Sequence, residues 1–424
     1  MRALIAPVFA LLLSTLFLQI GSGTASYLIP LRAAEEGWRT LNISLIAAGF
    51  AFAFTLGCIV VPRLVFKVGH VRVFSALTAL MAVSLLLHSL IVHPVFWILF
   101  RAMTGFAVAG SYMVLESWLN EKATNETRGS LFSIYMIVTM AGLTAGQFIV
   151  PQADISGTTL FIICGLTFLL SLLPTTLSTA SSPQPLNEVQ FNIKGMFVRS
   201  PIAVVVSVIC GFVTGTWMSL APVYSQSQGL TTTEGAVMLA MAVIGGAIFT
   251  YPMGKMSDKV DRRYVMIMIA IMGVISCIAA FFIGVENRIL FFGAIVFLGA
   301  AIFPLYSVMI AHANDYSAPD EFVETSSSLL IVYGLGSIAG PLVTALAMET
   351  FGDRGLFTVI AFSFVVVVAY SFYRISQREQ APEEDRSDFL VTPMARAATP
   401  QIFELDPRSD PEWGNDDPDY KSGF

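Results

Sequence analysis

The chain has 424 residues, 55 % of them hydrophobic and 12 % charged, with a mean hydropathy of +0.74 and a formal net charge of −6. Soluble globular proteins carry about 25 % charged residues, so this chain has too few to cover a water-facing surface, and a soluble enzyme is excluded. Residues 376–424 hold twelve acids and five bases, which leaves residues 1–375 with a net charge of +1. The acidity therefore describes the C-terminal end and not the hydrophobic body.

Long uncharged runs recur throughout that body. A membrane-spanning helix needs about 20 mostly apolar residues, because each residue adds 1.5 Å across a hydrocarbon core about 30 Å thick. Strands of membrane β-barrels are shorter, about ten residues, so the runs predict an all-α polytopic membrane protein. Breaks at charges, prolines and glycine-rich turns predict twelve helices, near residues 4–31, 42–63, 72–92, 95–119, 129–150, 157–178, 201–225, 233–254, 264–284, 288–312, 325–348 and 355–374.

Positive residues lie mainly on one side of these predicted helices. If the N-terminus is inside, fourteen Lys and Arg residues up to residue 378 fall on the inner side and four on the outer side. Positively charged loops stay in the cytoplasm. We therefore expect a multi-pass protein of the plasma (inner) membrane with cytoplasmic N- and C-termini.

An internal repeat relates the two halves of the body. A shift of 192 residues superposes Pro30 on Pro222 and Gly37 on Gly229 without a gap. Two six-helix units that run in the same direction are the plan of parallel-repeat transporters, which bind their solute between the units. The predicted domains are a six-helix bundle at 1–178, a cytoplasmic linker at 179–200, a second six-helix bundle at 201–375 and a disordered acidic cytoplasmic tail at 376–424.

The loop after the eighth predicted helix carries the most specific motif. It reads Gly254-Lys-Met-Ser-Asp258-Lys259-Val-Asp-Arg262-Arg263 and resembles the GxxxD(R/K)xGRR loop of the major facilitator superfamily. The resemblance extends to about residue 375 and implies two six-helix bundles. It also implies that this loop acts as a conformational lock. The alternative is that its basic residues serve only as anchors that fix the membrane topology.

The resemblance assigns the locking contact to Asp258. An acid at this position is expected to meet a helix N-terminus of the opposite half, where free N–H groups and the helix dipole attract anions. The expected target is the start of the fifth helix near Gly129 and Ser130. In the first half Phe66 stands where the family has an aspartate, so we expect an asymmetric lock.

The fourth predicted helix carries Arg101-Ala-Met-Thr-Gly105, which resembles the family's RxxxG motif. At 100° per residue Arg101, Tyr112 and Glu116 fall on one stripe of the helix. A charge in the hydrocarbon region costs about 2.5 to 3.5 kcal/mol and should face the bundle interior or water. We expect Arg101 to hold an anionic group or to displace a proton from a neighbouring acid. The alternative is a structural tie to backbone carbonyls or to the membrane interface.

Glu116 is an intramembrane acid near the predicted inner mouth. The stretch from Glu116-Ser117 through Arg128-Gly129 to Tyr135-Met136, together with the glycines of the eleventh helix, is similar to the YcaD-like branch of the superfamily. Two roles remain open for Glu116. It either carries a proton or forms an inner-gate ion pair with a cation such as Arg72 or Arg128.

Other polar and aromatic residues outline a candidate cavity for a small amphipathic ligand. Tyr and Trp also gather at membrane interfaces, which is the alternative for the aromatic members. Small residues at four-residue spacing in the fifth and eleventh helices indicate close helix packing. The substrate candidates besides Arg101, Tyr112 and Glu116 are Gln19, Gln147, Trp217, Tyr224, Tyr306 and Tyr333.

Neither a GxxxxGK(S/T) phosphate loop nor an HExxH motif occurs, and the four histidines show no metal-ligand spacing. We therefore expect no cofactor, no metal and no enzymatic activity. Energy for transport would then come from a gradient. One charge crossing 100 mV supplies about 2.3 kcal/mol, which corresponds to a solute concentration ratio of about 50, so one proton per cycle is enough to drive substantial uptake or efflux.

The sequence thus predicts a secondary active transporter that moves a small organic solute by alternating access, coupled to protons, with efflux favoured over uptake. The alternatives are an uncoupled facilitator and a transporter-like membrane sensor that completes no cycle. The expected partners are the solute, protons and the lipid bilayer, without nucleic acid, and the protein is expected to be a monomer.

Overall fold

A computed structural model describes residues 8–124, 127–177, 191–317, 321–380, 389 and 399–405. Within these residues twelve segments are long and apolar enough to cross a membrane, which confirms the predicted all-α polytopic fold. They are α2 (Phe9–Glu35), α3 (Thr40–Val68), α4 (His70–Leu90), α5 (Pro94–Lys122), α6 (Arg128–Gln147) with η1 (Val150–Gln152), α7 (Thr159–Leu170) with α8 (Leu172–Thr176), α10 (Pro201–Ser227), α11 (Thr232–Lys259), α12 (Arg262–Ile283), α13 (Arg288–Asn314), α14 (Phe322–Phe351) and α15 (Gly355–Gln377).

Several of these helices continue beyond their predicted ends. The predicted second helix stops at residue 63, whereas α3 runs through Pro62 to Val68. Membrane helices tolerate an internal proline because neighbouring groups satisfy the freed carbonyl. The break expected at His93-Pro94 is present, since the His93 side chain accepts a hydrogen bond from the Val95 N–H and begins α5.

Equivalent turns in the two halves adopt the same backbone conformation. Gly37 and Gly229, which the 192-residue shift superposes, have φ values of 72° and 74°. This left-handed region is readily available to glycine alone. Each glycine follows a helix that contains a proline, Pro30 in α2 and Pro222 in α10.

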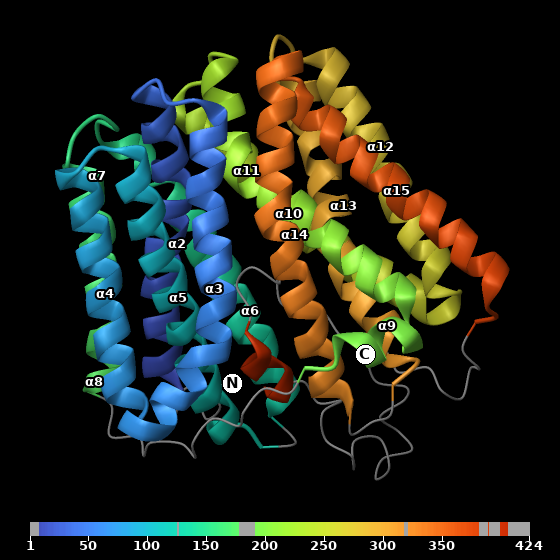
Figure 1. Cartoon of the computed structure of the whole chain (residues 1–424), viewed down its shortest axis with the longest axis horizontal. Coiled ribbons are helices and arrows are strands. Elements are labelled where there is room, and N and C mark those ends of the chain that lie inside the picture. Colours follow the sequence, from blue (N-terminus) through green and yellow to red (C-terminus); the bar gives the residue numbers. More distant parts are fainter. Residues whose placement is uncertain are drawn as a thin grey trace.

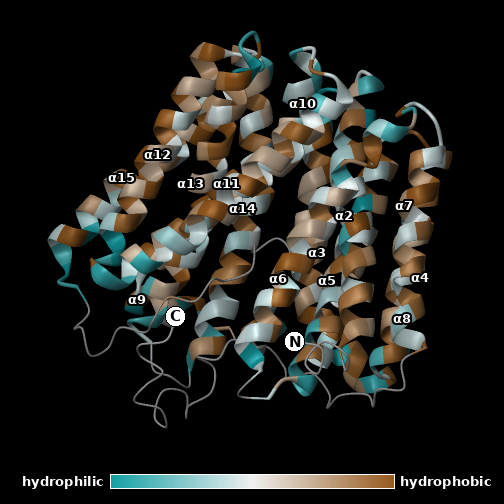
Figure 2. Ribbon diagram, turned by 180° about the vertical axis from the view of Figure 1, so that it is seen from behind, coloured by the Kyte–Doolittle hydropathy of each residue, from teal (hydrophilic) through white to brown (hydrophobic). Residues whose placement is uncertain are grey.

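The two six-helix groups lean together at one end of the molecule and diverge toward the other (Figure 1). Polar residues gather at the helix ends, and the helix shafts are largely apolar, as Figure 2 shows. We call the end where α3 and α11 finish the basic end, because it carries Lys67, Lys122, Arg128 and Lys259. The other end, at Gly37 and Gly229, is called the opposite end.

Glycines let α2 approach α6 and α10 approach α14. A Cβ atom at Gly23 would overlap the carbonyl oxygen of Leu143, and one at Gly336 would overlap the carbonyl oxygen of Val208. Small residues at membrane helix contacts allow such close approach. The same holds for the fifth and eleventh helices, which are predicted to pack closely: a Cβ atom at Gly146 would overlap the carbonyl oxygen of Ile20, and one at Gly340 would overlap that of Phe212.

Replacement of Gly23 by alanine should destabilise the N-terminal half. Since backbone atoms cannot move aside as a side-chain tip can, α2 and α6 must separate, at a cost of about 1–3 kcal/mol. Thermal unfolding of the detergent-solubilised protein measures this loss. Gly293→Ala is the matched control, because no atom lies within 4 Å of a Cβ placed at Gly293. Equal melting temperatures for the two variants would contradict the packing role of Gly23.

Two segments differ from the predicted domain plan. The predicted linker 179–200 contains a short helix, α9 (Ile193–Arg199), whose Met196 is fully buried. The tail 376–424 is predicted to be disordered, yet Phe389 is buried and residues 400–405 form a 3₁₀-helix, η5 (Pro400–Leu405). The difference arises because the tail is acidic on average, whereas the few apolar residues near its middle, such as Ile402 and Phe403, are buried. The rest of the tail beyond residue 380 lies outside the described residues.

Candidate functional site

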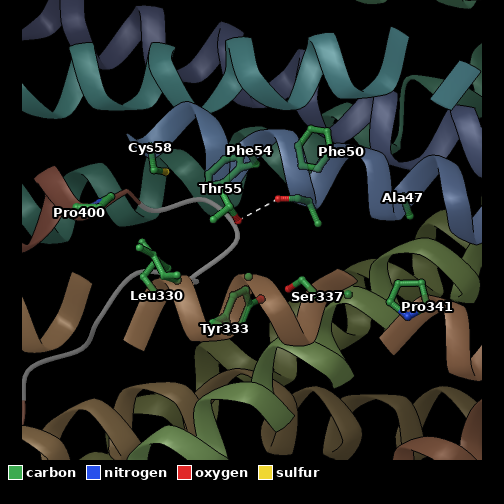
Figure 3. A pocket seen from close by; sticks show the side chains of 14 residues that line it. Ala47, Phe50, Phe54, Thr55, Cys58, Leu330, Tyr333, Ser337, Pro341 and Pro400 are labelled. Carbon is green, nitrogen blue, oxygen red and sulfur yellow. Dashed lines mark hydrogen bonds between the residues drawn. The ribbon is translucent and has the colours of Figure 1, made fainter. Parts of the chain in front are cut away.

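A cavity lies between α3 of the first half and α14 of the second. It has about 650 Å³ of space that no protein atom fills, part of it open to the outside. Figure 3 shows side chains of α3 facing side chains of α14, with Ala47 and Pro341 toward one end and Cys58, Leu330 and Pro400 toward the other. The lining is largely apolar, with polar groups at Thr55, Tyr333 and Ser337. An apolar concave site with a few polar groups is typical of small-molecule binding.

Arg101 lines a second cavity, of about 320 Å³, that adjoins the first. Both cavities include Ala47 and Phe50, and the second also includes Ser26 and Ser219. The Arg101 side chain is buried, and its guanidinium carbon lies 4.3 Å from the centre of the Phe50 ring. Such a cation–π contact stabilises a cation in an apolar region. The structure thus places Arg101 inside the bundle, between residues of both halves.

Glu116 lies on the same helix as Arg101, nearer the basic end, and is fully buried. Its Oε1 accepts a hydrogen bond of 2.9 Å from the Tyr135 hydroxyl, and its Oε2 accepts one from the Thr399 hydroxyl. Within the described part of the chain no ion pair joins Glu116 to Arg72 or Arg128. Its partners in this state are therefore the hydroxyl groups of Tyr135 and Thr399 and the backbone N–H groups of Thr399 and Ile402, the last three of which belong to the C-terminal segment.

Asp258 lies in the last turn of α11 at the basic end, and its hydrogen-bond partners among the described residues are not at the start of α6. Its Oδ1 accepts hydrogen bonds from the Phe389 backbone N–H at 2.9 Å and from Arg262 at 3.3 Å. The Phe389 ring lies against Gly254, the first residue of the motif. The expected contact with Gly129 and Ser130 is therefore not among the described contacts of this state, in which the halves diverge at this end.

The motif's arginines organise the end of the second half. Arg262 is buried and forms a two-point ion pair with Asp315 at the end of α13, at 2.7 Å and 3.2 Å. Burial alone would raise the pKa of Asp261, but hydrogen bonds and charge from Arg263 outweigh it and hold that pKa below its usual range. Lys259 is exposed. The arginines therefore make specific structural contacts within one half.

Four of the remaining candidates lie at the main cavity or contact one another beside it. Tyr333 lines the main cavity, and the Tyr306 ring packs edge-on against it at 5.4 Å. Tyr112 donates a hydrogen bond of 2.9 Å to Gln19, and its ring packs against Phe54 of the cavity.

Three further candidates lie away from both cavities. Gln147 and Trp217 are buried, and neither lines a described cavity. Tyr224 packs among aromatic rings of the second half, Phe291 and Phe357. Their expected contact with a solute finds no geometric support in this state.

Sequence reasoning missed the α3 wall of the cavity. Ala47, Ala51, Phe54 and Cys58 follow helical spacing along one stripe of α3. A stripe of small and aromatic residues is also typical of ordinary packing, so its pattern alone carries no functional signal.

At the opposite end a polar clamp joins the halves. Arg39 pairs with Glu349 at 2.6 Å, and the Leu41 N–H donates to the same carboxylate at 3.1 Å. The Tyr27 hydroxyl also donates to the Thr232 carbonyl at 2.6 Å. These contacts hold the two halves together on the side away from the basic end.

Glu349→Gln should weaken this clamp and favour opening at the opposite end. The Arg39 side chain is 72 % exposed, so the pair contributes at most about 1 kcal/mol, and the expected shift in the equilibrium is up to about fivefold. The modification rate of a cysteine placed at Ala47 measures that opening, and the effect should shrink at high salt. Glu234→Gln is the matched control, because Glu234 pairs with Arg288 inside one half. A shift of equal size in both variants would contradict the clamp.

Comparison with known proteins identifies the family. The sequence profile described as Major Facilitator Superfamily matches residues 11–284 and 228–405. An uncharacterized MFS-type transporter of Yersinia pestis (strain Pestoides F) is 26 % identical over 366 residues, 85 % of this chain and 94 % of the relative. The uncharacterized MFS-type transporter YcaD of Escherichia fergusonii is 26 % identical over 360 residues, 84 % of this chain and 92 % of the relative.

Solved structures share the fold at low sequence identity. The nucleoside transporter NupG has a TM-score of 0.76 at 12 % identity and covers 88 % of this chain and 100 % of its own. A bacterial homolog to the human lysosomal transporter Spinster has a TM-score of 0.74 at 15 % identity and covers 90 % of this chain and 97 % of its own. The chain therefore belongs to the Major Facilitator Superfamily and is similar to its uncharacterized YcaD-like members.

Proposed function

We propose that this membrane transporter moves a small, neutral or singly charged amphipathic organic solute by proton-coupled alternating access, with efflux favoured over uptake. The observation that carries the proposal is the cavity between α3 and α14, because both halves contribute its walls. A site shared by two rocking halves is exposed to one side or the other as they move.

The solute class follows from the walls of the two cavities. Phe50 and Phe54 supply flat apolar surface, and Thr55 and Ser337 supply hydroxyl groups. Among the described residues that line the two cavities, the charged one is Arg101, in the second cavity. One buried cation suits one anionic or strongly polar group, whereas a multiply charged solute would leave charges unpaired at a high desolvation cost.

The two acids divide the remaining work. Glu116 is the proposed proton carrier, since it is buried on the same helix as Arg101 and its described partners are uncharged hydrogen-bond donors. Asp258 is the proposed lock, which meets the start of α6 when the basic end closes. With the basic end cytoplasmic, the present conformation is the inward-facing one. The lock assignment of Asp258 also fits an uncoupled facilitator, in which Glu116 would not carry a proton.

A ligand screen tests the proposed solute class. A solute that binds the folded protein increases its free energy of unfolding and therefore raises its unfolding temperature. At a solute concentration of 100 times the dissociation constant, the increase in the free energy of unfolding is about 2.7 kcal/mol. The screen compares monocarboxylates with long apolar chains, neutral amphipathic compounds and polyanions on the detergent-solubilised protein. Growth and toxicity comparisons of deletion and overexpression strains supply further candidates. We expect stabilisation by the first two groups, and stabilisation by polyanions alone would contradict the proposal.

A further inference from the structure

The C-terminal segment lies inside the protein, between the two halves. Thr399, Ile402 and Phe403 are each at most 1 % exposed. The helix η5 contacts α5 and α6 of the first half and α14 of the second. In Figure 1 it lies at the basic end, where the two groups of helices diverge. The sequence composition predicts no burial here.

Hydrogen bonds attach this segment to both halves. The Thr399 hydroxyl donates to Glu116 of α5, and the Phe389 N–H donates to Asp258 of α11. The same two acids are the proposed proton carrier and the proposed lock. The segment therefore holds both acids in this state.

The segment also covers the main cavity. Pro400 lines that cavity together with Cys58 and Leu330, at the end shown in Figure 3. Cys58 is only 4 % exposed, although it lies on a cavity wall. A solute that moves between the cavity and the basic end has to pass the position that Pro400 and Ile402 occupy.

We propose that Phe389 and residues 399–405 form a built-in plug, bound at the mouth between the halves, that closes the cavity toward the basic end. The basic end can neither exchange solute nor close onto α6 until the plug leaves. Closure requires the hydrogen bond from the Phe389 N–H to Asp258 to break. It also requires the apolar side chains of Ile402 and Phe403 to leave the space between the halves. The plug is thus an inhibitory segment that competes with the Asp258 lock.

Chemical labelling of Cys58 tests the plug in the protein embedded in lipid nanodiscs, where both faces meet the reagent. Cys58 is made the sole cysteine by serine substitutions at the three other positions, Cys164, Cys210 and Cys277, all of which are buried. The probe is a membrane-impermeant maleimide. Thiol modification depends on access, so the full-length chain should react slowly.

Two variants remove the plug. Ile402→Asp places a charge at a fully buried position of the full-length chain, and truncation after Gln380 removes the segment. Each should raise the labelling rate of Cys58 by at least about tenfold. The matched controls are Gln380→Asp, at an exposed position, and truncation after Leu405, which keeps the plug. Both controls should label as slowly as the full-length chain.

Slow labelling of Cys58 in both plug variants would overturn the proposal. An equal rise at Cys210, tested as the sole cysteine, would also overturn it, because Cys210 lines neither cavity and its exposure would indicate general loosening. The inhibitory role rests on the proposed transport function, but the labelling requires no transport. A negative result here would therefore leave that function standing, and a failure of transport would leave the labelling result unaffected.

Discussion

Glu116→Gln should abolish proton-driven accumulation of solute and preserve solute exchange. Glutamine retains the shape and accepts the hydrogen bond from Tyr135, but it cannot carry a proton. One proton moving through 100 mV supports a concentration ratio of about 50, and this ratio should fall to about 1 in the variant. Reconstituted liposomes measure both quantities, with an imposed proton gradient for accumulation and preloaded solute for exchange.

The control for this substitution is Glu121→Gln. Glu121 lies five residues further along α5 and is exposed, so the same chemical change there should leave accumulation at the parental value. If Glu116→Gln still accumulates solute like the parent, Glu116 is not the proton carrier. If it loses exchange as well, the inner-gate role is favoured over coupling.

Arg101→Leu should weaken binding of an anionic or strongly polar solute by about 10- to 150-fold. The reason is the loss of a charge-assisted hydrogen bond, worth about 1.5–3 kcal/mol. Leucine fills a similar volume and packs on Phe50, so the walls of the cavity are retained. Thermal-shift titration with a solute found in the ligand screen measures the change in affinity.

Two further variants make this result specific. Arg101→Lys keeps the charge but not the planar donor geometry, so it should recover part of the affinity. Arg354→Leu is the matched control, since Arg354 stacks on Phe281 of the second half and lines neither cavity. A uniform loss in all three variants, or unchanged affinity in Arg101→Leu, would remove Arg101 from the solute site.

The membrane fold was readable from the sequence because its physical requirement is simple. A hydrocarbon core demands about 20 apolar residues per span, and each of the twelve runs became a helix. Helix ends were less predictable, since Pro62 and Pro252 lie inside helices that neighbouring segments support. The glycine contacts followed from spacing because close backbone approach leaves no room for a side chain.

The candidate site was only partly predictable, for two reasons. Arg101 and Glu116 stood out because charge is costly in a membrane, whereas the α3 wall carries no such signal. The plug escaped prediction because composition averages over a segment, and the acids of the tail outweigh the few apolar residues around Ile402. Pairings between distant segments, such as Thr399 with Glu116, depend on tertiary structure alone.

Solute flux in liposomes containing the purified protein is the most direct test of proton-coupled transport. The solute is one that stabilises the protein in the ligand screen, and a protonophore is added once accumulation is steady. We expect accumulation against the solute gradient, lost within the response time of the protonophore. Equilibration that stops at equal concentrations and ignores the protonophore would contradict coupling and favour the facilitator, and binding without any flux would contradict transport altogether.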